Sequence, residues 1–235
     1  MLFDLQSRGR RTAVKIIYLG LALLMGGGLL LFGIGTGTGT GGFFDIFKNN
    51  PTSQSAQADS AEKSATRRVR LHPQDPRAWY ALAYAHYQAA SSAYDATLNG
   101  GQGGFKTSGR SKLTEASTAW QHYLRLEQRN PSATLARLMS NAYSQGGLNQ
   151  PSNAAAALEI VAGDQPTEAN YATFAEYSYL AQQYRKGDLA AAKAVSLAPS
   201  AQRTLVRTQL AGIRRQVVQQ AARAGARGGV INGAG

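Results

Sequence analysis

The sequence predicts an all-α protein, in which a series of α-helical hairpins follows a single transmembrane helix. Three observations support this fold class. Residues 16–34 are mostly apolar and contain no charged side chain. After residue 50, alanine and glutamine are frequent whereas β-branched residues are sparse, which favours helix over strand. Prolines at positions 131, 166 and 199 recur at intervals of 35 and 33 residues, which indicates a repeated unit.

The apolar segment 16–34 has 19 positions, close to the roughly 20 residues with which a helix crosses a bilayer. Basic residues precede it, so the positive-inside rule places the N-terminal segment 1–15 in the cytoplasm and the rest of the chain outside. The run is longer than the apolar core of a cleavable signal, and no alanine-type cleavage pattern follows it. The glycines over 33–39 belong to no GxxxxGK[ST] motif, which disfavours a phosphate-binding loop. We therefore expect an uncleaved signal anchor.

A flexible linker is expected over residues 35–60. It begins with alternating glycines and ends with KNNPTSQSAQADS at 48–60, a polar stretch without aromatic residues. The next segment, AEKSATRRVR at 61–70, indicates the end of a helix that covers the first repeat.

The repeat pattern is clearest in DPRAWYALAYAHYQAA, which starts at Asp75. This segment resembles the first helix of a tetratricopeptide repeat, whose pattern is W-x2-L-G-x2-Y. The matching positions are Trp79, Leu82, Ala83 and His86. The second-helix pattern, A-x3-F followed by proline, is matched by Ala119, Tyr123 and Pro131, and again by Ala154, Leu158 and Pro166. The chain thus resembles the tetratricopeptide repeat (TPR) family, in a form with an N-terminal signal anchor typical of bacterial envelopes.

Further units follow the first one. TLARLMSNAYSQGG from Thr134 and NYATFAEYSYLAQQY from Asn170 resemble first helices, and KGDLAAAKAVSLAP resembles a shortened second helix. The glycine-rich segment 94–109 interrupts the first hairpin and is expected to be a surface loop. A capping helix over 200–223 should complete a helical domain that starts at residue 61 and ends at residue 223. The glycine-rich tail 224–235 is expected to be disordered.

Composition and spacing exclude several kinds of chemistry. The chain contains no cysteine, so it has no disulfide, thiol nucleophile or cysteine-based zinc site. Its histidines, His72, His86 and His122, lie outside any HExxH pattern. His86 and His122 belong to the two helices of the first hairpin and can meet there, but packing or solvation is the expected role of each. We expect no enzyme, no catalytic residue, no metal site and no cofactor.

Function is expected at a binding groove. In TPR arrays the first helices of the repeats line a concave groove that holds an extended polypeptide, so the resemblance implies partner contacts at groove-facing positions. Counted from Trp79, these positions are Tyr80, Tyr84 and Tyr87 in the first unit, Arg137 and Asn141 in the second, and Glu176 and Tyr179 in the third. Aromatic and arginine side chains are frequent interface anchors. Core packing is the alternative for the three tyrosines of the first unit, because they share one helix face.

The sequence therefore predicts a membrane-anchored scaffold or adaptor that binds a protein or peptide on the extracytoplasmic side, in envelope assembly or in a chaperone-like role. Two alternatives stay open. The chain has a net charge of +12, and six arginines but no acidic residue follow residue 199, so the C-terminus could bind anionic lipid or nucleic acid. Nucleic acid is not the expected partner outside the cytoplasm. The chain could also be a structural subunit of a membrane complex, or an oligomer through the transmembrane helix or the repeats.

Overall fold

A computed structural model describes residues 51–231 of this protein, with side chains over 57–223. The expected cytoplasmic segment 1–15, the transmembrane segment 16–34 and the first part of the expected linker lie outside the described residues. Among the helices that the structure does describe, none is both long and apolar enough to cross a membrane.

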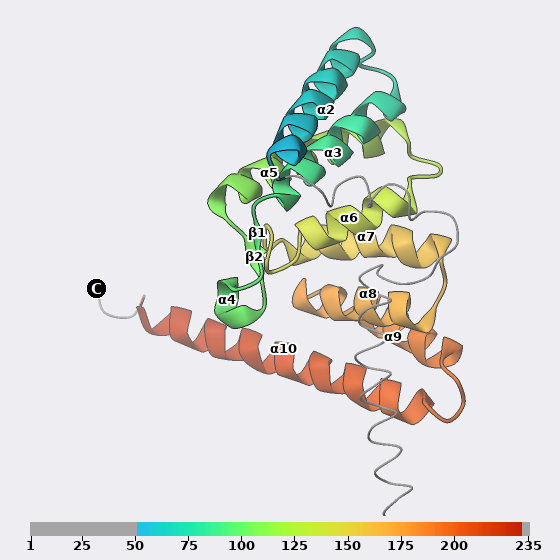
Figure 1. The fold of residues 1–235 in the computed structure, drawn as a ribbon. Coiled ribbons are helices and arrows are strands. Elements are labelled where there is room, and N and C mark those ends of the chain that lie inside the picture. Colours follow the sequence, from blue (N-terminus) through green and yellow to red (C-terminus); the bar gives the residue numbers. More distant parts are fainter. Residues whose placement is uncertain (1–50, 232–235) are drawn as a thin grey trace, which may run out of the picture. The chain divides into compact units, whose positions relative to one another are not determined.

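The described chain is mainly α-helical, which confirms the expected all-α class (Figure 1). Its elements, in chain order, are α2 (Pro51–Leu71), α3 (Pro76–Ser91), β1 (Tyr94–Asp95), α4 (Leu98–Gly101), β2 (Gly104–Phe105), α5 (Thr107–Leu126), α6 (Ala133–Ala142), α7 (Pro151–Asp164), α8 (Glu168–Leu180), α9 (Tyr184–Leu197) and α10 (Arg203–Ile231).

Short polar or proline residues fix where several helices begin. The Asp75 side chain accepts a hydrogen bond from the backbone of Arg77 at 2.9 Å and so caps α3, and Pro76 occupies the first turn. Ser132 and Thr167 cap α6 and α8 in the same way, with bonds to backbone N–H groups three residues later. These caps satisfy amide groups that have no partner inside the helix.

Most helices pack against their neighbours in sequence. The contacting pairs are α3 with α5, α6 with α7, α7 with α8, and α8 with α9, and α10 lies against both α8 and α9. Helices α3 and α5 also touch α6. This order of contacts is that of successive helical hairpins, each stacked on the next.

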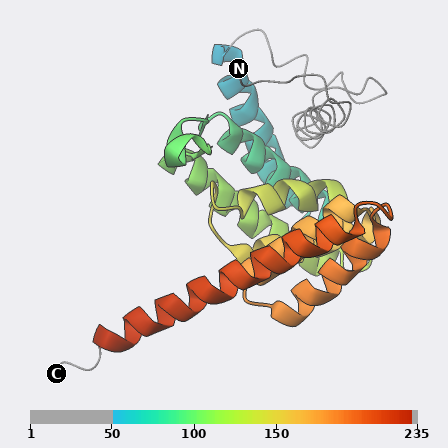
Figure 2. The ribbon, with the colours of Figure 1, turned by 90° about the horizontal axis from the view of Figure 1, so that it is seen from below.

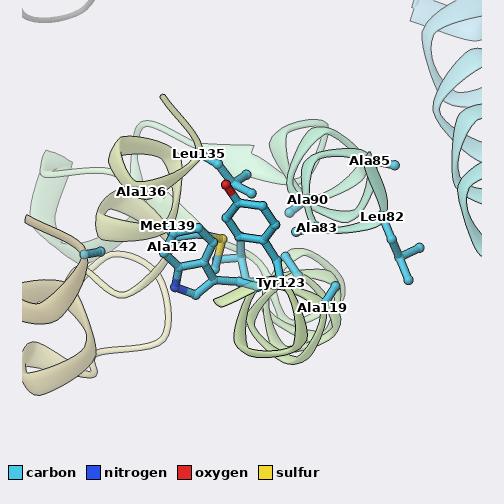
Figure 3. Close-up of a cluster of buried hydrophobic side chains, with 14 of the residues drawn as sticks. Leu82, Ala83, Ala85, Ala90, Ala119, Tyr123, Leu135, Ala136, Met139 and Ala142 are labelled. Atoms are coloured by element: carbon cyan, nitrogen blue, oxygen red, sulfur yellow. The ribbon is translucent and has the colours of Figure 1, made fainter. Parts of the chain in front are cut away.

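Two buried clusters hold these helices together. The N-terminal cluster consists of buried side chains from α2 to α7, and Figure 3 shows its centre, where Tyr123 and Met139 lie among α3, α5 and α6. The C-terminal cluster consists of buried side chains from α7 to α10. Helix α7 supplies residues to both: Ala154, Ala157 and Val161 face the first cluster, and Ala155, Leu158 and Ala162 face the second.

The segment 94–109 is more ordered than the surface loop expected from its glycines. Strands β1 and β2 pair antiparallel, with Tyr94 opposite Phe105. Phe105 is buried, and its backbone N–H donates to the Gly146 carbonyl at 2.9 Å, which ties the insertion to the α6–α7 turn. Gly103 has a φ of +80°, a conformation that favours glycine, so the glycines serve a tight docked hairpin.

Two expected boundaries differ from the structure. Helix α2 begins at Pro51, so the end of the expected linker is helical; proline is well suited to a first helical turn, where its missing N–H costs nothing. Helix α10 continues to Ile231, well into the expected disordered tail 224–235. Figure 2 shows α10 running past the ends of the helices on which it packs. Residues 232–235 lie outside the described part.

Candidate functional site

Three tyrosines and one asparagine form a partly exposed surface, here called the tyrosine face: Tyr80, Tyr84, Tyr87 and Asn141. The tyrosines lie on α3 and are half-buried. The rings of Tyr80 and Tyr84 stack with centroids 6.5 Å apart, and the Tyr80 ring meets the edge of the Tyr123 ring at 5.9 Å. Packing against the N-terminal cluster therefore fixes the inner side of the tyrosines and leaves their outer side accessible.

The tyrosine face crosses from α3 to α6 through Tyr87. Burial raises the pKa of the Tyr87 hydroxyl, and the neighbouring Asn141 side chain on α6 lowers it in part. Asn141 itself is exposed, so its amide has capacity for further hydrogen bonds. The predicted groove positions of the first unit, Tyr80, Tyr84 and Tyr87, thus share one surface with Asn141, a predicted groove position of the second unit.

The Arg137 side chain makes hydrogen bonds with the segment that leads into α8. Its guanidinium donates to the Gln165 side-chain oxygen at 3.1 Å and to Asn170 Oδ1 at 3.4 and 3.5 Å. Asn170 is buried, and its amide donates to the Gln165 carbonyl at 2.7 Å. Arg137 therefore connects α6 with the start of α8, although a guanidinium with five N–H donors keeps some for a partner.

Glu176 lies in a cleft between α8 and α10 with a volume of about 470 Å³. The apolar part of this α8–α10 cleft comes from Ala172, Val206, Leu210 and Ile213. Burial raises the pKa of the Glu176 carboxyl above its ordinary value. Within the described residues, this half-buried carboxylate has no ion-pair partner. It could therefore pair with a positively charged group of a ligand.

Tyr179, a predicted groove position, is almost fully buried and contributes only a small part of its surface to a cleft of about 370 Å³ lined mainly by α9 and α10. Its side chain is only 2% exposed and belongs to the C-terminal cluster. The hydroxyl donates to Asp188 Oδ1 at 3.0 Å, and the ring packs over Gly187 of α9. Burial and Asp188 both raise the pKa of Tyr179. Tyr179 is a packing residue between α8 and α9.

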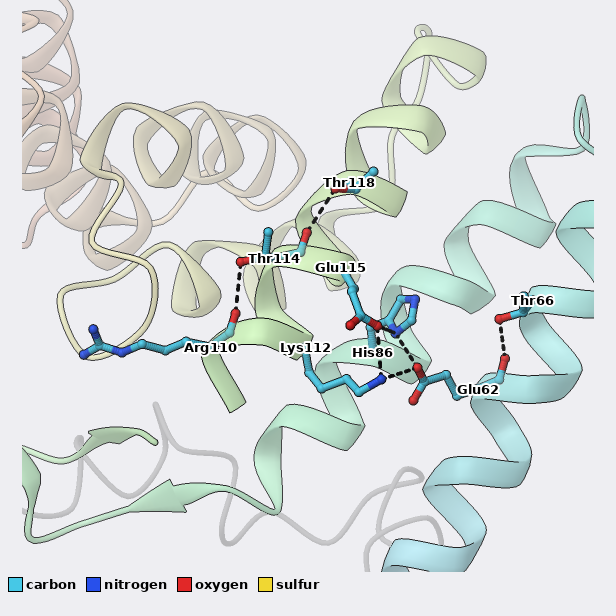
Figure 4. A network of polar contacts seen from close by, with 8 residues as sticks. All are labelled: Glu62, Thr66, His86, Arg110, Lys112, Thr114, Glu115 and Thr118. Carbon is cyan, nitrogen blue, oxygen red and sulfur yellow. Dashed lines mark hydrogen bonds and ion pairs between the residues drawn. The ribbon is translucent and has the colours of Figure 1, made fainter. Parts of the chain in front are cut away.

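A polar cluster that the sequence did not reveal joins three helices, as Figure 4 shows. It consists of Glu62 on α2, His86 on α3, and Lys112 and Glu115 on α5. His86 Nδ1 lies 3.1 Å from a carboxylate oxygen of Glu62 and 3.1 Å from one of Glu115. Lys112 pairs with the same two carboxylates. The four residues lie on three different helices, so no local sequence motif predicts the cluster.

His86 and His122, which the sequence allowed to meet within the first hairpin, have separate partners in the structure. His86 is turned toward the carboxylates of the polar cluster. His122 stacks on the Trp79 ring, with centroids 4.1 Å apart and planes within 8°.

The C-terminal arginines divide into two groups. Arg203 donates to the Ala198 carbonyl at 3.1 Å, and Arg214 pairs with Asp188 at 3.0 Å while lying over the Tyr184 ring. Arg207, Arg215 and Arg223 are exposed on α10. Arg203 and Arg214 therefore hold α10 against its neighbours, whereas the other three arginines face solvent.

Comparison with known proteins adds no relative: no family model, curated protein or solved structure matches this chain.

Proposed function

We propose that this protein is a non-enzymatic scaffold of the TPR type that binds an extended polypeptide across its first helices. In this proposal residues 16–34 anchor the chain in the cytoplasmic membrane, with the N-terminus inside and the helical domain on the extracytoplasmic side. The partner would be a client or component of envelope assembly. The tyrosine face is the observation that carries the proposal.

The packing of the repeats supports the TPR part of this proposal. The glycine-like position of the pattern falls on Ala83, Ser140 and Ala175, which are all buried, with at most 6% exposure. The large residue just before each of them is also buried: Leu82, Met139 and Phe174. Small side chains there let the two helices of a hairpin approach, and the large side chains fill the space toward the next hairpin.

The tyrosine face supports the binding part. Tyr80 and Tyr84 are held by ring stacking, so little conformational entropy remains to be lost when a partner orders them. Tyrosine provides both an apolar ring and a hydroxyl, which suits an extended segment with mixed side chains and free backbone groups. Asn141 adds a side-chain amide that can pair with the backbone of such a segment.

A binding experiment tests the proposal. The full chain, extracted in mild detergent, would be used to capture its partner, and a peptide series from that partner would be titrated against wild type and Tyr84→Ala. Loss of this half-buried aromatic anchor should weaken peptide binding about fivefold to thirtyfold, equivalent to roughly 1–2 kcal/mol.

Thr118→Ala is the matched control, because Thr118 is exposed on α5, a second helix of the pattern, and lies outside the tyrosine face. Its affinity should equal that of wild type. Equal affinity of Tyr84→Ala and wild type would show that the partner binds elsewhere.

The electrostatic alternative keeps one supporting observation, the exposed arginines of α10. If these carried the function, binding of anionic vesicles would fall steeply with salt, and Arg207→Gln combined with Arg215→Gln would weaken it. Under the scaffold proposal the same double substitution leaves the affinity for the peptide unchanged.

A further inference from the structure

We propose that Glu62, His86 and Glu115 together bind one divalent transition-metal cation, for which Zn²⁺ is the best match, and that this ion joins α2 to the hairpin of α3 and α5. The inference is independent of the proposed binding function. It rests on the positions of three ligand atoms, on the surroundings of the histidine nitrogen, and on the charge of the cluster.

The ligand atoms already have the spacing of a metal site. One atom from each of the three residues lies within 4.8 Å of the other two. The two distances from His86 Nδ1 to the carboxylate oxygens are both 3.1 Å. Tetrahedral Zn²⁺ with bonds of about 2.0–2.1 Å separates its ligand atoms by roughly 3.3 Å. An ion can therefore enter among the three atoms after small side-chain adjustments.

The histidine nitrogen supports a cation rather than a simple hydrogen bond. His86 is only 8% exposed, and its buried Nδ1 makes no hydrogen bond of acceptable geometry within the described residues. In the neutral tautomer that carries its proton on Nε2, the lone pair on Nδ1 faces two carboxylate oxygens, which is repulsive unless a positive charge lies between them. Neutral imidazole is also the form that binds metals.

The charge balance of the cluster favours a divalent ion. Two carboxylates face one ammonium group, that of Lys112, when His86 is neutral. The Lys112 side chain is 35% exposed, so it can turn toward solvent when a metal ion binds. The two carboxylates then neutralise the 2+ charge, and water completes the coordination at the exposed side of Glu115. Lys112 and the metal ion are thus competitors for the same oxygens.

The location gives the ion a structural role. In the described part of α2, the residues that enter the N-terminal cluster are Ala65 and Val69, both with short side chains. Glu62 lies about one helical turn before Ala65, and a bond from Glu62 to the metal would fasten this part of α2 to α3 and α5. Structural zinc sites stabilise a fold by such cross-links between elements that pack weakly on their own.

Titration of the full chain in detergent with Zn²⁺, followed by calorimetry, tests the proposal. One ion per chain should bind, and Glu62→Gln or Glu115→Gln should each weaken it by at least about tenfold. Lys112→Met should strengthen binding by roughly threefold, because it removes the competing cation. Co²⁺ in place of Zn²⁺ should give the visible absorption of a four-coordinate site in wild type and lose it in His86→Gln. Far-UV circular dichroism checks that each variant is folded.

Glu159→Gln is the matched control, since Glu159 pairs with Lys186 at 2.8 Å elsewhere on the surface. It should leave Zn²⁺ affinity unchanged. The proposal is overturned if no stoichiometric Zn²⁺ binding occurs, if Glu62→Gln and Glu159→Gln behave alike, or if Lys112→Met fails to raise the affinity. Those results would make the cluster an ion-pair network in which Lys112 is the permanent cation.

Discussion

The centre of the N-terminal cluster and helix α9 of the C-terminal cluster are packed in different ways. The first contains large side chains, among them Leu113, Trp120 and Tyr143, all nearly inaccessible to solvent. In the second, the buried apolar residues of helix α9 are two alanines, Ala190 and Ala194, and Ala198 follows as the C-terminal cap. Large side chains fill space between helices, whereas alanines require the helix backbones to approach closely. The comparison shows that tolerance to substitution should differ between the two halves.

The tryptophans provide a way to observe the halves separately. The chain has two, and both Trp79 and Trp120 belong to the N-terminal cluster or pack against it. Tryptophan fluorescence therefore reports on the first cluster, while far-UV circular dichroism reports on all helices. Each prediction below uses this difference or sharpens it.

The largest effect is expected for Met139→Ala. Met139 has no exposed surface and lies among α3, α5 and α6. Its truncation should lower the free energy of unfolding by about 2–5 kcal/mol through lost contacts and a residual cavity. Urea unfolding monitored by tryptophan fluorescence should shift to lower concentration. A change below about 1 kcal/mol would show that the N-terminal cluster is not tightly packed.

Gly187→Ala should have the next largest effect on stability, and this effect should fall on the C-terminal cluster. An added Cβ would lie 2.5 Å from two carbon atoms of the Tyr179 ring, so α8 and α9 must separate. The free energy of unfolding should fall by about 1–3 kcal/mol. In urea, the unfolding transition seen by circular dichroism should move to lower concentration, with little change in the one seen by tryptophan fluorescence.

Gly212→Ala on α10 is the control for Gly187→Ala, because nothing lies within 4 Å of the added Cβ. Helix propensity predicts a gain of about 0.5–1 kcal/mol there. Equal effects of the two substitutions would show that close approach of α8 and α9 is unimportant.

Ser117→Ala tests the hydrogen bond inside the N-terminal cluster. The hydroxyls of Ser117 and Tyr143 are 2.8 Å apart and buried. Without Ser117 the Tyr143 hydroxyl loses this partner, so about 1–2 kcal/mol of stability should be lost. The double variant with Tyr143→Phe should recover part of the loss in urea unfolding. If the double variant recovers no stability, the loss comes from altered packing and not from the unpaired hydroxyl.

The smallest effect, and a favourable one, is expected for Glu176→Gln. Burial raises the pKa of Glu176 above 4.5, so the folded state binds the proton more tightly than the unfolded state. Its contribution to stability therefore falls as pH rises through 4.5 and the raised folded value. The variant should melt about 1–3 °C higher than wild type at pH 7, with the difference vanishing near pH 4. An equal gain at both pH values would exclude ionisation as its cause.

Local signals predicted much of the fold. Prolines after the second helices and the repeat-like segment that starts at Asp75 placed several helix boundaries. Helical spacing also placed Tyr80, Tyr84 and Tyr87 on one face of α3, where the structure has them half-buried. These features depend on residues close in sequence, which is why sequence reasoning reached them.

Other features depend on residues brought together only by packing. Tyr179 has the spacing of a groove position, but it is buried because Gly187 leaves room for its ring and Asp188 accepts a hydrogen bond from its hydroxyl. Glu62 and Lys112 pair across 50 residues of sequence. The glycine-rich insertion looked exposed because its docking depends on the Gly146 carbonyl, far along the chain.

Helix α7 has a consequence for shortened forms of the protein. Its two apolar strips face opposite sides, and α8 covers the one formed by Ala155, Leu158 and Ala162. A chain cut just after Asp164 would keep the N-terminal cluster but leave that strip bare. Such a fragment would bury it against another copy of itself, so proteolysis in the α7–α8 turn should yield a self-associating product.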